Sequence, residues 1–141
     1  MRNKVFLVGV IVIVVVAIGF GIWGFWNILD YSEKTKHETN RWAVIKDLKG
    51  DVIALETTNP DVWNTLVSLH NNQTEMWIGG IIEEYDNYWG FRFKPDTIVM
   101  AQITIEGAQS NIQGIHENLN YWMNVWTKET YVLAKIIEIH E

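Results

Sequence analysis

The feature that most constrains this chain is a long apolar run near its start. Residues 5–29 contain no charged side chain. A hydrocarbon core of about 30 Å is crossed by ~20 apolar residues in a helix, because each backbone polar group needs a partner within the segment. Trp23, Phe25 and Trp26 end the run, where aromatic side chains are typical of the headgroup region. The run therefore predicts that residues 1–29 form an N-terminal membrane anchor.

A cleaved signal peptide is the main alternative to this anchor. The basic residues Arg2 and Lys4 and the small residues Ala17 and Gly19 suit a signal peptide. Its apolar region, however, spans only ~7–15 residues, so we favour an uncleaved signal anchor. Basic residues close before the run predict a cytoplasmic amino terminus. We therefore expect a single-pass protein of the cell membrane, in contact with the lipid bilayer, whose C-terminal domain is extracytoplasmic.

The rest of the chain divides into a short linker and one domain. Residues 30–41 are polar and of mixed charge, which is typical of a juxtamembrane linker. Residues 42–141 hold six Lys and Arg against fourteen Asp and Glu, a net charge of −8 with His neutral. Such a surface repels phosphate backbones, so no nucleic-acid partner is expected. The chain has no Cys, which excludes disulfides, thiolate zinc sites and a cysteine nucleophile.

Apolar periodicity predicts that residues 42–141 form a small α+β globular domain. The expected order is β-β-α-β-β-β-α-β, with strands over 41–46, 52–57, 75–84, 89–94, 98–106 and 131–140 and helices over 58–72 and 108–126. We expect a mostly antiparallel sheet with two helices covering one face. The last strand is apolar on both sides, which indicates a central position. Gly79 and Gly80 indicate a bulge or a close backbone approach.

One short stretch, WGFRFKP, places two cations on the same side of an expected strand. Trp89, Phe91 and Phe93 alternate with Arg92 and Lys94. Two cations on one face could bind the carboxylate or phosphate of a ligand. The alternative, which we favour, is that both point outward from an aromatic strand and pair with nearby acids.

The tryptophans are the most unusual part of the composition. Trp122 and Trp126 belong to the apolar stripe of the second expected helix, which predicts that they are buried. Trp77 has the opposite parity to Met76 and Ile78 on its strand. Because tryptophan is enriched among residues that dominate protein interfaces, Trp77 is the candidate to face a partner.

Other chemistry-bearing residues give weaker hypotheses. If His116, Glu117 and His140 converged they could bind copper or zinc, although solvated histidines at element ends are the favoured interpretation. Glu83 and Asp86 could perform acid–base work, but a solvated turn is favoured. There is neither a G-x-S-x-G sequence nor a glycine-rich phosphate loop. We therefore expect no cofactor and no enzymatic activity.

Four segments carry a family resemblance. They are TTNPDVW, MWIGGII, YWGFRFKPDTI and ITIEGA, at residues 57–63, 76–82, 88–98 and 103–108. Over residues 42–139 the chain resembles the amino-terminal domain of slime-mould-type calmodulin-binding proteins, a domain of unknown function. It departs from that family at Gly107-Ala108, where the family has Cys-Asp, and at Val125-Trp126, the nearest remnant of Cys-Pro-Trp. The resemblance implies a fold; cysteine chemistry and calmodulin binding do not carry over.

These features favour a non-catalytic accessory subunit or interaction module of a larger membrane complex. Membrane-protein partners are expected through the anchor and the aromatic-rich domain. Gly9, Gly19, Gly21 and Gly24 would allow close helix packing within the anchor. The alternatives are an anchored ligand-binding or metal-binding domain and, least favoured, an anchored hydrolase.

Overall fold

The computed structural model describes residues 39–104 and 106–141. The predicted anchor and all of the linker up to residue 38 lie outside the described residues. Within the described residues, no helix is both long and apolar enough to cross a membrane.

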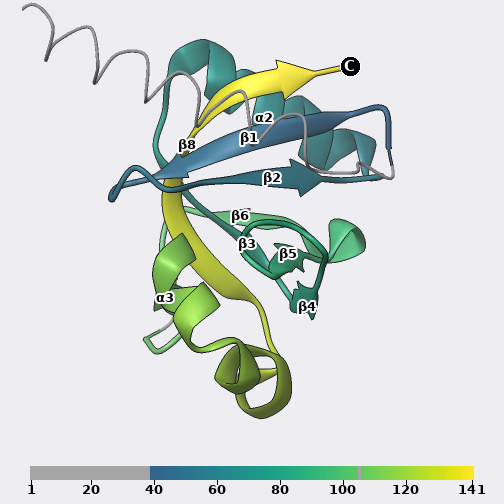
Figure 1. The fold of residues 1–141 in the computed structure, drawn as a ribbon. Coiled ribbons are helices and arrows are strands. Elements are labelled where there is room, and N and C mark those ends of the chain that lie inside the picture. Colours follow the sequence, from purple (N-terminus) through teal and green to yellow (C-terminus); the bar gives the residue numbers. More distant parts are fainter. Residues whose placement is uncertain (1–38, 105) are drawn as a thin grey trace, which may run out of the picture. The chain divides into compact units, whose positions relative to one another are not determined.

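The described residues form an α+β domain built on a mostly antiparallel sheet (Figure 1). The main sheet has the order β2 (Val52–Glu56), β1 (Trp42–Asp47), β8 (Thr130–His140), β3 (Met76–Gly80) and β6 (Val99–Ala101). The short β7 (Gln109–Ser110) adds a parallel pairing to β8. A separate hairpin consists of β4 (Ile82–Glu84) and β5 (Phe91–Phe93). The α+β class and the central position of the last strand, β8, are thus confirmed.

Local chemistry explains where the first helix begins and ends. Helix α2 (Pro60–Asn72) starts after Asn59, whose side chain accepts hydrogen bonds from the N–H groups of Asp61 and Val62. Pro60 fits the first helical position, since a missing N–H costs nothing there. Gln73 ends the helix in the left-handed conformation, at φ 52°. The helix buries three side chains against the sheet: Trp63, Leu66 and Leu69.

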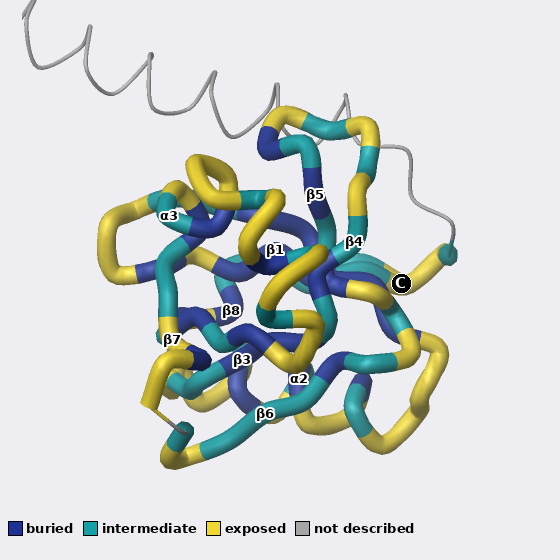
Figure 2. The backbone as a smooth tube through the Cα atoms, turned by 90° about the horizontal axis from the view of Figure 1, so that it is seen from below, coloured by how far each residue is buried: buried dark blue, intermediate teal, exposed yellow. Residues whose placement is uncertain are grey.

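The two faces of the main sheet are covered differently from the prediction. Figures 1 and 2 show α2 on one face and, on the other, both the β4–β5 hairpin and α3 (Ile112–Glu117). The expectation of two helices on one face was therefore wrong. Phe91 and Phe93 of the hairpin are buried, as are Ile112 and Ile115 of α3.

The helix predicted over 108–126 is broken. In its place the structure has the short strand β7, then α3, and then η2 (Tyr121–Trp126), a stretch of π-helix. Asn118 leaves the helical conformation at φ −130° and ψ 32°. Its side-chain Nδ2 donates to the Gly114 carbonyl at 2.9 Å, so the amide competes with the helical backbone at that point. Ile112, Ile115 and Trp122 of the predicted apolar stripe are buried. Trp126 is only partly buried, so its predicted burial was wrong.

The strand predicted over 75–84 is also divided. β3 ends at Gly80 and β4 begins at Ile82 in the other sheet. At the crossing, the Ile81 N–H donates to Thr97 Oγ1 at 2.9 Å. Its carbonyl accepts from the Lys94 N–H at 2.8 Å. Thr97 belongs to η1 (Pro95–Thr97), a turn that leads into β6.

Two further expectations concern Gly79 and the strand over 98–106. A Cβ on Gly79 would lie 1.9 Å from the Thr130 carbonyl oxygen of β8, so the expected close backbone approach is confirmed. The strand predicted over 98–106 is shorter in the structure, where β6 covers only Val99–Ala101.

Candidate functional site

A partly exposed apolar surface surrounds Trp77 on the main sheet. Trp77 pairs with Leu133 of β8 and Ala101 of β6, while Gly79 pairs with Tyr131 and Val99. Paired residues lie on the same face, and alternate residues return to it. We call this set the Trp77 face: Trp77, Val99, Ala101, Tyr131 and Leu133. All five side chains are partly exposed, whereas Ile78 and Val132 on the opposite face are fully buried.

The Trp77 face lies on the same side of the sheet as α2. Asp47 pairs with Ala134, and its Oδ2 accepts a hydrogen bond from the Ile112 N–H of α3 at 3.0 Å. Ala134 therefore faces α3. The β8 residues that alternate with it, Tyr131 and Leu133 among them, face the α2 side of the sheet. On this α2 side of the sheet, Lys135 follows Leu133 and Glu75 precedes Trp77. Lys135 Nζ and Glu75 Oε1 form an ion pair at 3.4 Å. An apolar centre with an ion pair at its edge is the usual pattern of a protein interface.

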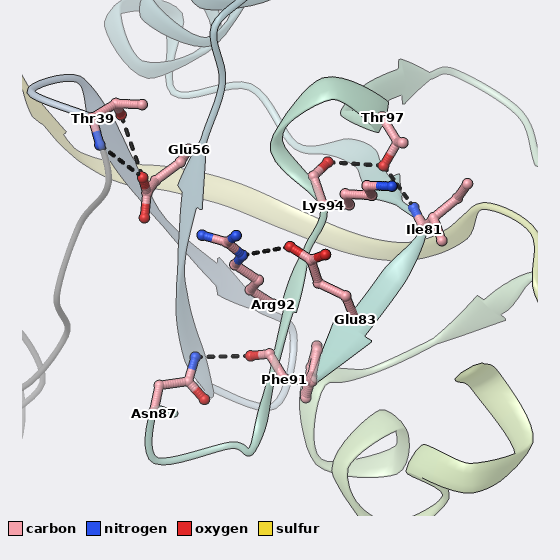
Figure 3. A network of polar contacts seen from close by, with 9 residues as sticks. All are labelled: Thr39, Glu56, Ile81, Glu83, Asn87, Phe91, Arg92, Lys94 and Thr97. Atoms are coloured by element: carbon pink, nitrogen blue, oxygen red, sulfur yellow. Dashed lines mark hydrogen bonds and ion pairs between the residues drawn. The ribbon is translucent and has the colours of Figure 1, made fainter. Parts of the chain in front are cut away.

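Arg92 is engaged within the β4–β5 hairpin. Its Nε donates to Glu83 Oε1 at 2.6 Å (Figure 3). Its guanidinium carbon lies 4.3 Å from the ring centroid of Tyr85. The side chains of Arg92 and Glu83 are only 14% and 31% exposed. Lys94 is exposed two residues further on. The hairpin thus pairs Arg92 with an internal carboxylate, as the favoured interpretation of the sequence expected, but the Arg92 side chain is mostly buried and does not point outward into solvent.

The two candidate acids are placed differently. Glu83 binds Arg92 across the hairpin, in register with it. Asp86 is exposed in the turn that joins the two strands. The Glu83 carboxylate is thus occupied by a structural ion pair within the hairpin.

The structure does not bring the predicted metal ligands together. His116 Nδ1 lies 2.7 Å from the Trp89 carbonyl oxygen of the hairpin. Glu117 accepts from the side chain of Gln113 on its own helix. Among the described residues, no group of three or more His, Asp and Glu side chains could hold a metal ion.

His140 has its own partners at the end of β8. Its ring stacks on Trp42 with centroids 3.7 Å apart and planes 6° apart. His140 Nε2 lies 2.9 Å from Glu138 Oε2. Beside them, the Trp63 indole N–H donates to Glu141 Oε1 at 2.7 Å, so α2 is tied to the last residue of the chain.

Sequence reasoning missed the structural importance of Asp47. This buried carboxylate accepts from the Lys49 and Asp51 N–H groups through Oδ1 and from the Ile112 N–H through Oδ2. It closes the turn between β1 and β2 and fixes the start of α3. An aspartate just before a Gly-containing turn was the available signal, since such side chains commonly bind turn N–H groups. The bond to Ile112, 65 residues away, has no local signal.

Replacing Asp51 with Asn is expected to stabilise the domain at neutral pH. Burial raises the pKa of Asp51 above its ordinary value of 3.8, and the charge of Asp47 raises it further, while Lys49 lowers it. The folded state thus binds the proton more tightly than the unfolded state, so ionised Asp51 lowers stability above the folded pKa. We expect a gain of less than about 1 kcal/mol at pH 7.

The gain from Asp51→Asn should disappear below pH 3.8, where the wild-type carboxyl is protonated in both states. Urea unfolding of residues 37–141, which form one compact unit, measures both values. A variant less stable than wild type at pH 7 would show that the carboxylate makes a net favourable contact.

Comparison with protein-family models, curated proteins and solved structures found no match to the chain. The resemblance to slime-mould-type calmodulin-binding proteins therefore stays a prediction.

Proposed function

We propose that this protein is a non-catalytic, single-pass membrane-anchored interaction module, an accessory subunit whose extracytoplasmic domain docks onto another protein of the same membrane. The observation that supports this most is the Trp77 face. It combines a central tryptophan, partly exposed apolar neighbours and an ion-paired edge on three hydrogen-bonded strands. Large aromatic side chains held rigidly at the centre of a surface supply most of the binding energy in protein interfaces.

The length of the linker limits where the partner lies. Residues 30–38 separate the apolar run from Thr39 and span at most about 30 Å when fully extended. Thr39 is held where it enters the domain, since its N–H and Oγ1 both donate to Glu56 Oε2 (Figure 3). A linker of this length favours a partner in the same membrane. With a net charge of −8 over residues 42–141 it does not favour anionic lipid, so the proposed occupant is an apolar surface of a membrane-protein subunit.

The alternative functions have less support from the geometry. Ligand binding by Arg92 and Lys94 would compete with the 2.6 Å pairing of Arg92 to Glu83. Metal binding by His116 and His140 would require two residues that contact different partners, Trp89 and Trp42.

Replacing Trp77 with Thr is expected to release the partner. Thr keeps the β propensity of the position and removes the aromatic anchor. Wild-type full-length chain purified from its membranes in mild detergent should retain a stoichiometric partner, identified by mass spectrometry. Trp77→Thr should weaken retention by at least tenfold, which is about 1.4 kcal/mol and modest for an interface tryptophan.

The matched control is Tyr88→Thr, which removes an aromatic side chain that is 79% exposed in the β4–β5 turn. This variant should retain the partner as wild type does. A wild-type chain that carries no other protein would overturn the proposed function, as would equal retention by Trp77→Thr and Tyr88→Thr.

A further inference from the structure

The segment around β6 carries none of the charges or prolines that protect many sheet edges, although β6 itself has only three residues. Residues 98–105 read IVMAQITI, without charge, proline or glycine, in a domain that is otherwise acidic. Edge strands that stay unpaired in natural proteins are blunted by charged residues or proline. Uncharged segments of high β propensity instead associate through their backbones.

The structure places β6, residues Val99–Ala101 of this segment, at the end of the main sheet. In the part of the chain that the structure describes, β3 is the only strand paired with β6. The opposite end of the sheet differs, because β2 lies against β5 of the hairpin. Figure 2 shows β6 along the margin of the domain. Just beyond it, Ile103 is 86% exposed, the highest value among the large apolar side chains described.

We propose that β6 pairs with β6 of a second copy of this chain, in antiparallel orientation about a two-fold axis. Such an axis brings the same segment of each copy together, which is the commonest symmetry of homo-oligomers. Since residues 98–105 are uncharged, two domains of net charge −8 can meet there without opposing like charges. A basic peptide would find no acidic side chain along this edge, which favours a second copy as the occupant.

Pairing at β6 also enlarges the Trp77 face. Val99 and Ala101 of β6 belong to that face and lie beside Trp77 of β3. A two-fold axis at the β6 edge would join the Trp77 faces of both copies into one continuous apolar surface. The inference does not depend on the proposed function, because the edge can pair whether or not another protein covers Trp77.

The absence of native cysteine allows a direct test by disulfide crosslinking. Val99, Met100, Ala101 and Gln102 are replaced by Cys one at a time in the full-length chain, which is oxidised in its membranes. Opposed residues of an antiparallel pair have Cα atoms about 4.5–5.5 Å apart, within the range for a disulfide. We expect covalent dimers, strongest at the position nearest the axis. Ser68→Cys, on the exposed side of α2, is the control and should stay monomeric on a non-reducing gel.

A second measurement uses a charge at the edge. Ile103→Lys should weaken self-association of the detergent-solubilised full-length chain by at least tenfold, measured by light scattering. Leu48→Lys makes the same change at a side chain that is 68% exposed in the β1–β2 turn, and should leave association unchanged.

Absence of crosslinks at all four substituted positions would overturn the inference, as would a dimer that Ile103→Lys does not weaken. A β6 Cys variant that also carries Trp77→Thr should crosslink as the same Cys variant does without it, so failure of the docking proposal and failure of the β6 proposal are distinguishable.

Discussion

Replacing Gly79 with Ala is expected to remove most of the stability of the domain. The added Cβ would lie 1.9 Å from the Thr130 carbonyl oxygen, 2.8 Å from its carbonyl carbon and 2.9 Å from the Tyr131 Cα. All three atoms are backbone of β8, the central strand, so no side-chain rotation can relieve the overlap. We expect a loss of more than about 4 kcal/mol, an exceptional value for one methyl group. Urea unfolding of residues 37–141, followed by circular dichroism, measures it.

Gly114→Ala is the matched control for this substitution. Its Cβ would lie 2.9 Å from Ser110 Oγ, a side-chain atom that can rotate away. Alanine also favours the helix over glycine by roughly 1 kcal/mol, so the net change should be within about 1 kcal/mol. A Gly79→Ala variant that unfolds at the wild-type urea concentration would contradict the close approach of β3 and β8.

The glycine pair shows which parts of the fold could be predicted from sequence. Two adjacent glycines in an apolar strand indicate a close approach, and the structure confirms it at Gly79. The change of sheet at Ile81 could not be predicted, because its apolar side chain continues the strand pattern. That change is fixed by the hydroxyl of Thr97, 16 residues later in the chain.

The candidate site likewise has features that the sequence predicts and features that it does not. Alternation alone predicts that Phe91 and Phe93 point inward and Arg92 outward. Both phenylalanines are buried, but the Arg92 side chain is mostly buried as well. The partner of Arg92 depends on the register of the hairpin, which the Tyr85–Gly90 turn fixes through a hydrogen bond from the Tyr85 N–H to the Gly90 carbonyl at 3.2 Å. The tertiary placement of His116 and His140 also bears on the metal-binding hypothesis, because the two residues have different partners. His116 faces the hairpin from α3, and His140 stacks on Trp42 at the end of β8.

Replacing Asp47 with Ala is expected to cost about 3 kcal/mol, because hydrogen bonds to a charged group contribute about 1.5–3 kcal/mol each and are not additive. The buried carboxylate accepts three backbone hydrogen bonds of 2.9–3.0 Å. The Lys49 and Asp51 N–H groups lie in the β1–β2 turn, where water can replace the lost acceptor in part. The Ile112 N–H lies at the start of α3, and the Ile112 side chain is fully buried. Without Asp47, water does not replace the acceptor of this N–H. The largest share of the loss should therefore come from the junction between β1 and α3.

The Ile112 bond can be separated from the loss of charge. Asp61→Ala removes one exposed acid from the first turn of α2 and should cost only about 0.3–1 kcal/mol, through the helix dipole. Asp47→Asn keeps one acceptor oxygen and should fall between the two alanine variants. For a domain of about 100 residues, 3 kcal/mol lowers the melting temperature by roughly 12–24 °C, which calorimetry of residues 37–141 resolves easily. Equal melting temperatures for Asp47→Ala and Asp61→Ala would show that the turn and α3 are held by packing alone. In that case the bond to Ile112 would be a consequence of the fold, with no part in fixing the position of α3.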